Sequence, residues 1–234
     1  MVCFDAMAFS ARSWKLFGVL VVVALMATGV MMLGLAEVHE HLGGARMERW
    51  DARVQTDVHN DTGRRTTEAM FALTWIGSPA VLTPAIPVIA ALLWWRRLRH
   101  AAIVWLIATA GAGALVTVLK LHFRRVRPDL PWAFVHEPSF SFPSGHSVLA
   151  VVVYGMAIYI GLRRLRRDWQ RVALLAVAAA LVVGIGVSRV YLGAHYPSDV
   201  AAGYFVGAVW LGAVLGADRY VRRVERSSNP NHAR

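Results

Sequence analysis

Residues 188–199 of the chain read SRVYLGAHYPSD and stand between two long apolar runs, Val172–Val187 and Val200–Ala217. An arginine, a histidine and an aspartate therefore lie together between two segments that avoid water. Of the 234 residues, 57% are hydrophobic, a higher share than is usual for soluble domains of this length. We interpret the two runs as separate membrane-spanning helices, with the quoted stretch as the polar junction between them.

Four further uncharged runs are long enough, or nearly so, to cross a bilayer. They are Leu16–Leu35, Ala69–Trp95, Ala101–Leu119 and Ser147–Leu162. The sequence therefore predicts an all-α fold, a six-transmembrane-helix bundle that forms a single membrane domain. The runs at 147–162 and 172–187 cover about 24 Å each at about 1.5 Å per residue, so their ends should lie at the headgroup level of a hydrocarbon core of about 30 Å.

Two of the runs have particular features. Pro79, Pro84 and Pro87 predict a kink or a break in the second span. The first run begins with basic residues and ends in small residues before Glu37, as a signal peptide does, but its apolar part exceeds the usual length of about 7–15 residues. We favour a retained helix, and either interpretation leaves the later loops on the same sides.

Positive charge predicts the orientation of the bundle. Residues 1–15, the 96–100 and 163–171 loops and the tail 218–234 share one side, where the only acids are Asp5, Asp168, Asp218 and Glu225. The basic residues of this side are Arg12, Lys15, Arg96, Arg97, Arg99, Arg163, Arg164, Arg166, Arg167, Arg171, Arg219, Arg222, Arg223, Arg226 and Arg234. By the positive-inside rule this side is cytoplasmic, both termini are cytoplasmic, and residues 188–199 face the outside of the plasma membrane.

The net charge of +11 does not indicate a nucleic-acid partner, because the basic residues occur in short clusters between apolar runs rather than along one soluble face. The single cysteine, Cys3, excludes an internal disulfide and a cysteine-built metal site.

The outer loop 37–66 contains an amphipathic segment, Gly43–Asn60. Met47, Trp50, Val54 and Val58 are spaced as one stripe of a helix, with charged residues opposite. This pattern is typical of a helix that lies in the membrane interface, where it would line lipid entry. The alternative is a helix that packs over the ends of the spans. Four tryptophans fit interfacial belts: Trp94, Trp95, Trp132 and Trp169.

Three polar stretches fall on the same, outer face of the predicted bundle. KLHFRRVRP follows the third span, PSGH precedes the fourth, and residues 188–199 join the fifth and sixth. The cations at positions 120, 124, 125 and 127 lie on the outer face, although the positive-inside rule concentrates cations on the cytoplasmic side. This exception suggests that an anion holds them there. Ser144 can cap the helix that begins after it, and the amides around Gly145 would form an anion site at the positive end of that helix.

His195 and Asp199 are four residues apart, so the carboxylate can accept a hydrogen bond from the imidazole. That bond would fix the tautomer and leave the other ring nitrogen free to react. A pair with this spacing is also common as a purely structural feature.

Taken together, three motifs resemble the signature of the phosphatidic acid phosphatase type 2 superfamily. They are Lys120-x6-Arg127-Pro128, Pro143-Ser144-Gly145-His146 and Ser188-Arg189-x5-His195-x3-Asp199. Its members include integral-membrane lipid phosphate phosphatases. The resemblance covers about residues 65–217, the catalytic core being 67–217, and no signature position departs from it. The family shares a fold core with vanadium-dependent haloperoxidases and acid phosphatases.

The resemblance implies a metal-independent phosphatase without a cofactor. The implied catalytic residues are His195, which attacks phosphorus and becomes a phosphohistidine, Asp199, which orients it, and His146, which protonates the leaving oxygen. The implied phosphate-binding residues are Lys120, Arg127, Ser144, Gly145 and Arg189, with Arg125 as a further candidate. We assign His122 and Arg124 to the phosphate field or the interface, treat His136 and Glu137 as solvated loop residues, and assign no role to His39, His41 and His59.

The short spans would place this site among lipid headgroups, so a lipid phosphate is the expected partner. The candidates are undecaprenyl diphosphate, which an outward site favours, then phosphatidylglycerol phosphate and phosphatidic acid, then lipid A phosphate. The alternatives from other classes of protein are a lipid transporter and a vanadate-dependent haloperoxidase-like protein. A lipid transporter would usually show duplicated halves, and none is evident; a haloperoxidase-like protein should be soluble and larger.

Overall fold

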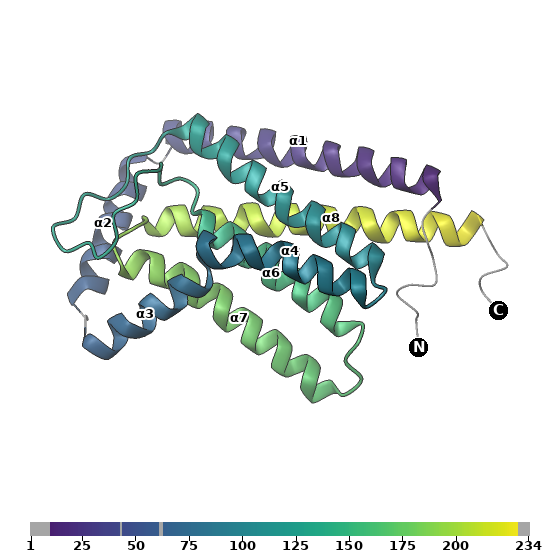
Figure 1. Cartoon of the computed structure of the whole chain (residues 1–234). Coiled ribbons are helices and arrows are strands. Elements are labelled where there is room, and N and C mark those ends of the chain that lie inside the picture. The colour runs from purple at the N-terminus through teal and green to yellow at the C-terminus, as the bar shows by residue number, and fades with distance from the viewer. Residues whose placement is uncertain (1–9, 43, 61–62, 229–234) are drawn as a thin grey trace.

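A computed structural model describes residues 10–42, 44–60 and 63–228, and every regular element in these ranges is an α-helix (Figure 1). The helices are α1 (Ala11–Leu42), α2 (Gly44–Asn60), α3 (Arg64–Ile76), α4 (Pro79–Trp95), α5 (Arg99–Phe123), α6 (Gly145–Leu162), α7 (Asp168–Tyr191) and α8 (Pro197–Ser228). The histidines at positions 39, 41 and 59 lie outside the residues whose side chains are described.

Five of these helices, α1, α5, α6, α7 and α8, are long and apolar enough to cross a membrane. α3 and α4 pass the same test only as a pair, which makes them a sixth candidate span, bent by 41° at a short break. The break falls at Gly77 and Ser78, where the Ser78 hydroxyl accepts a hydrogen bond from the Val81 amide and Pro79 begins α4. The predicted all-α bundle and the predicted break in the second span are confirmed.

α7 is longer than its apolar run. It has 24 residues and continues through Ser188 and Arg189, whose side chains are buried. At about 1.5 Å per residue the helix reaches about 36 Å, more than the hydrocarbon core. These two polar residues therefore lie in the last turn of a full-length span and face the bundle.

α8 packs along α6 at very short range. A Cβ atom added to Gly203 would come within 2.8 Å of the Ser144 carbonyl oxygen, and one added to Gly207 within 3.0 Å of the Val148 carbonyl oxygen. Only glycine leaves room for this approach. The contact holds the first turns of both helices side by side.

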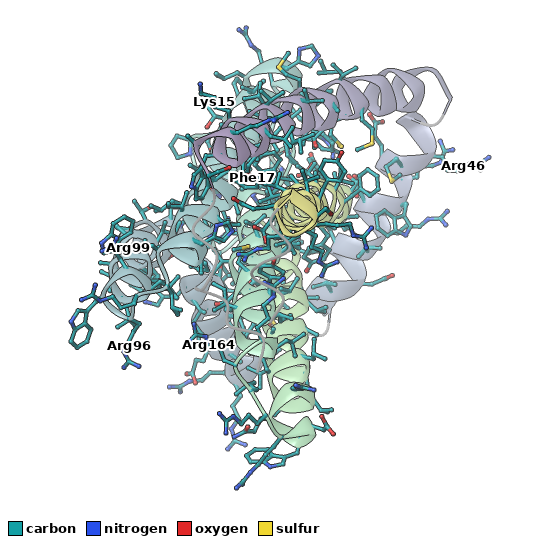
Figure 2. All side chains as sticks on the ribbon, turned by 90° about the vertical axis from the view of Figure 1, so that its right-hand side faces the viewer. Lys15, Phe17, Arg46, Arg96, Arg99 and Arg164 are labelled. Carbon is teal, nitrogen blue, oxygen red and sulfur yellow. The ribbon has the colours of Figure 1, made fainter. Side chains whose placement is uncertain are left out.

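α1 packs with the rest of the bundle, since Phe17 and Met32 belong to its buried core. α1 begins and α8 ends at the same end of the bundle, where the Ser10 amide donates to the Glu225 carboxylate at 2.7 Å (Figure 1). Figure 2 looks onto this end and shows Lys15, Arg96 and Arg164 distributed around it.

A buried polar cluster lies close to this end. Asp218 of α8 is fully buried and accepts hydrogen bonds from Tyr159 of α6 and from Arg222, at 3.1 Å. The His100 ring of α5 lies 2.5 Å from the same carboxylate. Because a buried charge is costly without partners, this cluster links three spans at a fixed position.

α2 crosses the opposite end of the bundle (Figure 1). The predicted helix is therefore present, and Trp50 on its apolar stripe is 46% exposed. Its buried side is polar, however, because Asp51 and Gln55 are 1% and 3% exposed. α2 thus packs over the span ends through polar side chains, and the placement of its apolar stripe in a membrane remains a prediction.

Candidate active site

The three polar stretches meet at the end of the bundle that α2 crosses. α5 ends there, α6 and α8 begin there, and α7 ends there, with the 124–144 loop between α5 and α6 lying across them (Figure 1). The Ser144 amide donates to the Asp199 carbonyl at 3.0 Å, and the Phe134 amide donates to the Leu192 carbonyl at 3.1 Å. The first hydrogen bond joins the second and third stretches directly, and the second joins the loop to the third stretch.

Lys120 and Arg127 share acceptors in the loop. Lys120 Nζ donates to the Phe140 carbonyl at 2.7 Å and to Ser139 Oγ at 3.3 Å. Arg127 donates to the Ser139 carbonyl at 2.7 Å and to Ser139 Oγ at 2.9 Å. The first stretch therefore contributes two neighbouring cations.

Glu137 joins two of the cations. Its carboxylate accepts from Arg127 Nη2 at 2.7 Å and from Arg189 Nη2 at 2.5 Å, while Arg189 Nη1 donates to Thr74 Oγ1 of α3 at 2.8 Å. The prediction that Glu137 is a solvated loop residue was wrong, because the paired arginines draw this side chain into the cluster. Neither Glu137 nor Thr74 belongs to a motif, so their places follow only from the fold.

A tight turn at Gly193 positions His195. Gly193 has φ +73°, a left-handed conformation, and a Cβ there would lie 2.9 Å from Ala133 Cα. This ending of α7 lets the amides of Ala194 and His195 donate to the Arg189 carbonyl at 3.0 and 3.2 Å. The histidine and Arg189 are thereby held in one short piece of backbone.

The contacts of His195 define its tautomer. Its Nε2 lies 3.1 Å from Arg127 Nη1, and arginine can only donate, so Nε2 is the unprotonated acceptor and Nδ1 carries the proton. Nδ1 faces Asp199 Oδ2 at 3.4 Å, a contact longer than a good hydrogen bond. The expected orientation of this pair is present, although the hydrogen bond itself is not closed.

Asp199 also belongs to the start of α8. Its Oδ2 accepts from the Tyr196 amide at 3.0 Å, as the third residue of a helix does in a capping box. The aspartate thus has a structural task beside its contact with His195.

The first turn of α6 lies next to these groups. Ser144 is the N-cap residue, but its side chain makes no capping bond, and its buried hydroxyl has no hydrogen-bond partner among the residues described. The expectation that the Ser144 side chain caps α6 was wrong. His146 is 6% exposed and lies in the electrostatic field of Arg189, Glu137 and His195. A helix N-terminus, a hydroxyl and an imidazole therefore border the cationic cluster.

Arg125 has different partners from the other cations. Its guanidinium donates to Asp51 at 2.8 Å and to Asp199 at 2.7 Å, and it stacks on the Tyr196 ring at 4.1 Å. The structure therefore places this candidate behind Asp199, where it is engaged by two carboxylates.

The electrostatics of the cluster favour a neutral histidine beside a charged glutamate. Burial, and then the positive charges of Arg127 and Arg189, lower the pKa of His195 well below 6.5. Burial alone would raise the pKa of Glu137, but Arg189 and Arg127 outweigh it and lower that pKa to about 2. At neutral pH the site therefore presents an unprotonated imidazole nitrogen among cations.

The family model of the PAP2 superfamily matches residues 100–223, more than half of the chain. The chain belongs to the PAP2 superfamily. It is thus a multi-pass integral membrane protein with the phosphatase fold of that superfamily, and the matched range contains all three polar stretches.

Relatives and a solved structure agree with this assignment. This PAP2 protein is 35% identical over 157 residues to phosphatidylglycerophosphatase B of Bacillus subtilis, covering 67% of this chain and 77% of that protein. It is 34% identical over 131 residues to an undecaprenyl-diphosphatase of Sulfolobus acidocaldarius, covering 54% of this chain and 59% of that protein. The crystal structure of a transmembrane PAP2-type phosphatidylglycerolphosphate phosphatase from Bacillus subtilis superimposes with a TM-score of 0.72 at 30% identity, over 84% of this chain and 96% of that one.

A prediction follows from Glu137, which pairs with Arg127 and Arg189, the two arginines that the sequence predicts to bind phosphate. In a Glu137→Gln variant the competing carboxylate is gone, so inorganic phosphate should inhibit this PAP2 protein at a concentration lower by on the order of tenfold, the factor for about 1.4 kcal/mol. The measurement is the inhibition constant for inorganic phosphate, with the thermal unfolding temperature as control. An unchanged constant in a stably folded variant would show that the carboxylate does not compete.

Proposed function

We propose that the protein is a lipid phosphate phosphatase that works through a phosphohistidine on His195. One observation carries the proposal: the Nε2 atom of a buried, neutral His195 faces a cluster of three cations, Lys120, Arg127 and Arg189. A phosphate ester fits such a cluster because its oxygens carry the negative charge that the cations neutralise.

In the proposed binding step the phosphate takes the place of the Glu137 carboxylate between Arg127 and Arg189. The planar guanidinium groups suit paired phosphate oxygens, whereas Lys120 acts as a point charge. The free hydroxyl of Ser144 and the amide of Gly145 supply two further donors at the start of α6.

In the proposed chemical steps, His195 Nε2 forms a bond to phosphorus while the bond from phosphorus to the leaving oxygen breaks. His146, protonated, gives its proton to that oxygen, and Asp199 stabilises the charge that develops on the His195 ring. Water then attacks the phosphohistidine with His146 as the base, and inorganic phosphate leaves. Side chains supply the positive charge in each step, so the proposal includes no metal ion and no cofactor.

The proposed orientation places the site on the outer face of the plasma membrane with both termini in the cytoplasm. It is supported by the basic residues at the end where α1 begins and α8 ends, which the positive-inside rule assigns to the cytoplasm (Figure 2). The substrate is then a lipid whose phosphate lies at the outer headgroup layer.

Two substrates lead the proposal. An outward site favours undecaprenyl diphosphate, the preference reached from the sequence, and one relative is named an undecaprenyl-diphosphatase. The relative and the solved structure that share more of this chain are named for phosphatidylglycerol phosphate, which supports that lipid equally. Phosphatidic acid and lipid A phosphate complete the set.

The test is phosphate release from purified protein in detergent, with each of these four lipids and with EDTA present throughout. We expect release from at least one lipid and none from the His195→Ala control. Failure to release phosphate from every lipid, or release only after EDTA is replaced by a divalent metal, would overturn the proposal.

A further inference from the structure

α2 reaches the catalytic group from outside the three motifs. α2 is rich in polar residues, most of which are exposed, but Asp51 in the middle of the helix is only 1% exposed. Its Oδ1 accepts from the Ser198 amide at 2.9 Å, and its Oδ2 accepts from Ser198 Oγ at 2.6 Å and from Arg125 Nη2 at 2.8 Å. The carboxylate thus caps the first turn of α8 from a different helix.

Arg125 links Asp51 to Asp199. While Nη2 binds Asp51, Nη1 donates to Asp199 Oδ1 at 2.7 Å and to Ser198 Oγ at 2.8 Å. One guanidinium therefore bridges two carboxylates, and the face of Tyr196 fixes its plane.

The result of these contacts is a defined direction for the Asp199 carboxylate. Arg125 holds Oδ1 and the Tyr196 amide holds Oδ2, which leaves Oδ2 facing His195 Nδ1 at 3.4 Å. One turn beyond Asp51, Gln55 Nε2 donates to the His195 carbonyl at 3.4 Å. The same face of α2 therefore touches both members of the pair.

We propose that Asp51 is a positioning residue that, through Arg125 and Ser198, aims the Asp199 carboxylate at His195. The inference rests on the proposed function, because positioning matters only if His195 is the nucleophile. Lys120, Arg127 and Arg189 have no hydrogen bond to Asp51 among the residues described, so the phosphate-binding cations do not depend on it.

Asp51→Asn keeps the shape of the side chain and an acceptor for Ser198 but removes the charge that Arg125 binds. We expect the rate constant of phosphohistidine formation, measured in a single turnover, to fall by about 10–100-fold, as small displacements of a reacting group do. The inhibition constant for inorganic phosphate should stay within about threefold, and so should the amplitude of phosphohistidine formation. Asp51→Glu should recover part of the rate.

The matched control is Asp57→Asn, the same chemical change at an exposed position of α2, which should behave as the wild type. In an Arg125→Lys background, adding Asp51→Asn should lower the rate by less than about threefold, because the path through the guanidinium is already lost.

The outcomes are separable. An unchanged rate constant in Asp51→Asn, or a lower amplitude with an unchanged rate constant, overturns the positioning role, the second result being that of a purely structural residue. A wild-type protein that neither forms phosphohistidine nor releases phosphate overturns the proposed function itself, and the inference with it.

Discussion

Replacement of His195 by alanine should lower phosphate release by about 10⁴-fold or more, the largest loss expected from any single change in the site. The variant has no nitrogen at the position of Nε2, which faces Arg127 at 3.1 Å, and therefore no atom that can bond to phosphorus. No phosphohistidine should form, and the measurement is turnover together with acid-labile phosphate on the protein.

The cations of the site remain in this variant, so the inhibition constant for inorganic phosphate in a residual-activity or binding assay should change little. His136→Ala is the matched control, because this histidine is exposed in the same loop region as Glu137 and should leave turnover unchanged. Near-normal turnover by His195→Ala would remove it as the nucleophile.

Replacement of His146 by alanine should lower the rate by on the order of 10²–10⁴-fold with a lipid phosphate, the usual contribution of general acid–base catalysis. The loss in phosphohistidine formation should be much smaller with p-nitrophenyl phosphate, whose leaving group needs no proton. Comparison of single-turnover rates with the two substrates measures this difference, and an equal loss with both would contradict the role of general acid.

The pH profile gives an independent test of the same assignment. Because the pKa of His195 is lowered well below 6.5, its nitrogen remains unprotonated at neutral pH, and the nucleophile is lost only as the pH falls below that range. The negative charge of a bound phosphate favours the protonated form of His146. The fall in rate of the substrate complex on the alkaline side should therefore report loss of that proton and should disappear in His146→Ala. A flat profile of the wild type from pH 5 to 9 would contradict this pairing, provided that chemistry limits the rate.

Much of the fold could be predicted because each span is a long uncharged run and each signature residue has fixed neighbours in sequence. The site residues from three distant stretches do meet at one end, as predicted, although their individual roles remain predictions. The pairing of Glu137 with Arg127 and Arg189 joins residues ten and 52 positions apart, so nothing in the local sequence could indicate it.

Asp51 escaped prediction for a related reason. A helix with one apolar stripe is expected to turn that stripe inward or into lipid, and here the bundle end offers α2 an arginine and a helix N-terminus instead. The hydrogen bonds of Asp51 to these partners therefore bury a charged side chain on the other side of the helix, which the hydrophobic pattern alone does not indicate.

The buried cluster around Asp218 has a consequence for where the enzyme can act. Asp199 and Asp218 belong to the same straight helix, α8, and are separated by about 28 Å along its axis at about 1.5 Å per residue, close to the thickness of an average hydrocarbon layer. A shift of α8 by one turn in either direction along the membrane normal would move the cluster around Asp199 or the cluster around Asp218 into the hydrocarbon core. The distance between the two clusters therefore matches the thickness of one hydrocarbon layer. In a membrane several ångströms thicker or thinner, the lipid phosphate should lie at the wrong height for His195.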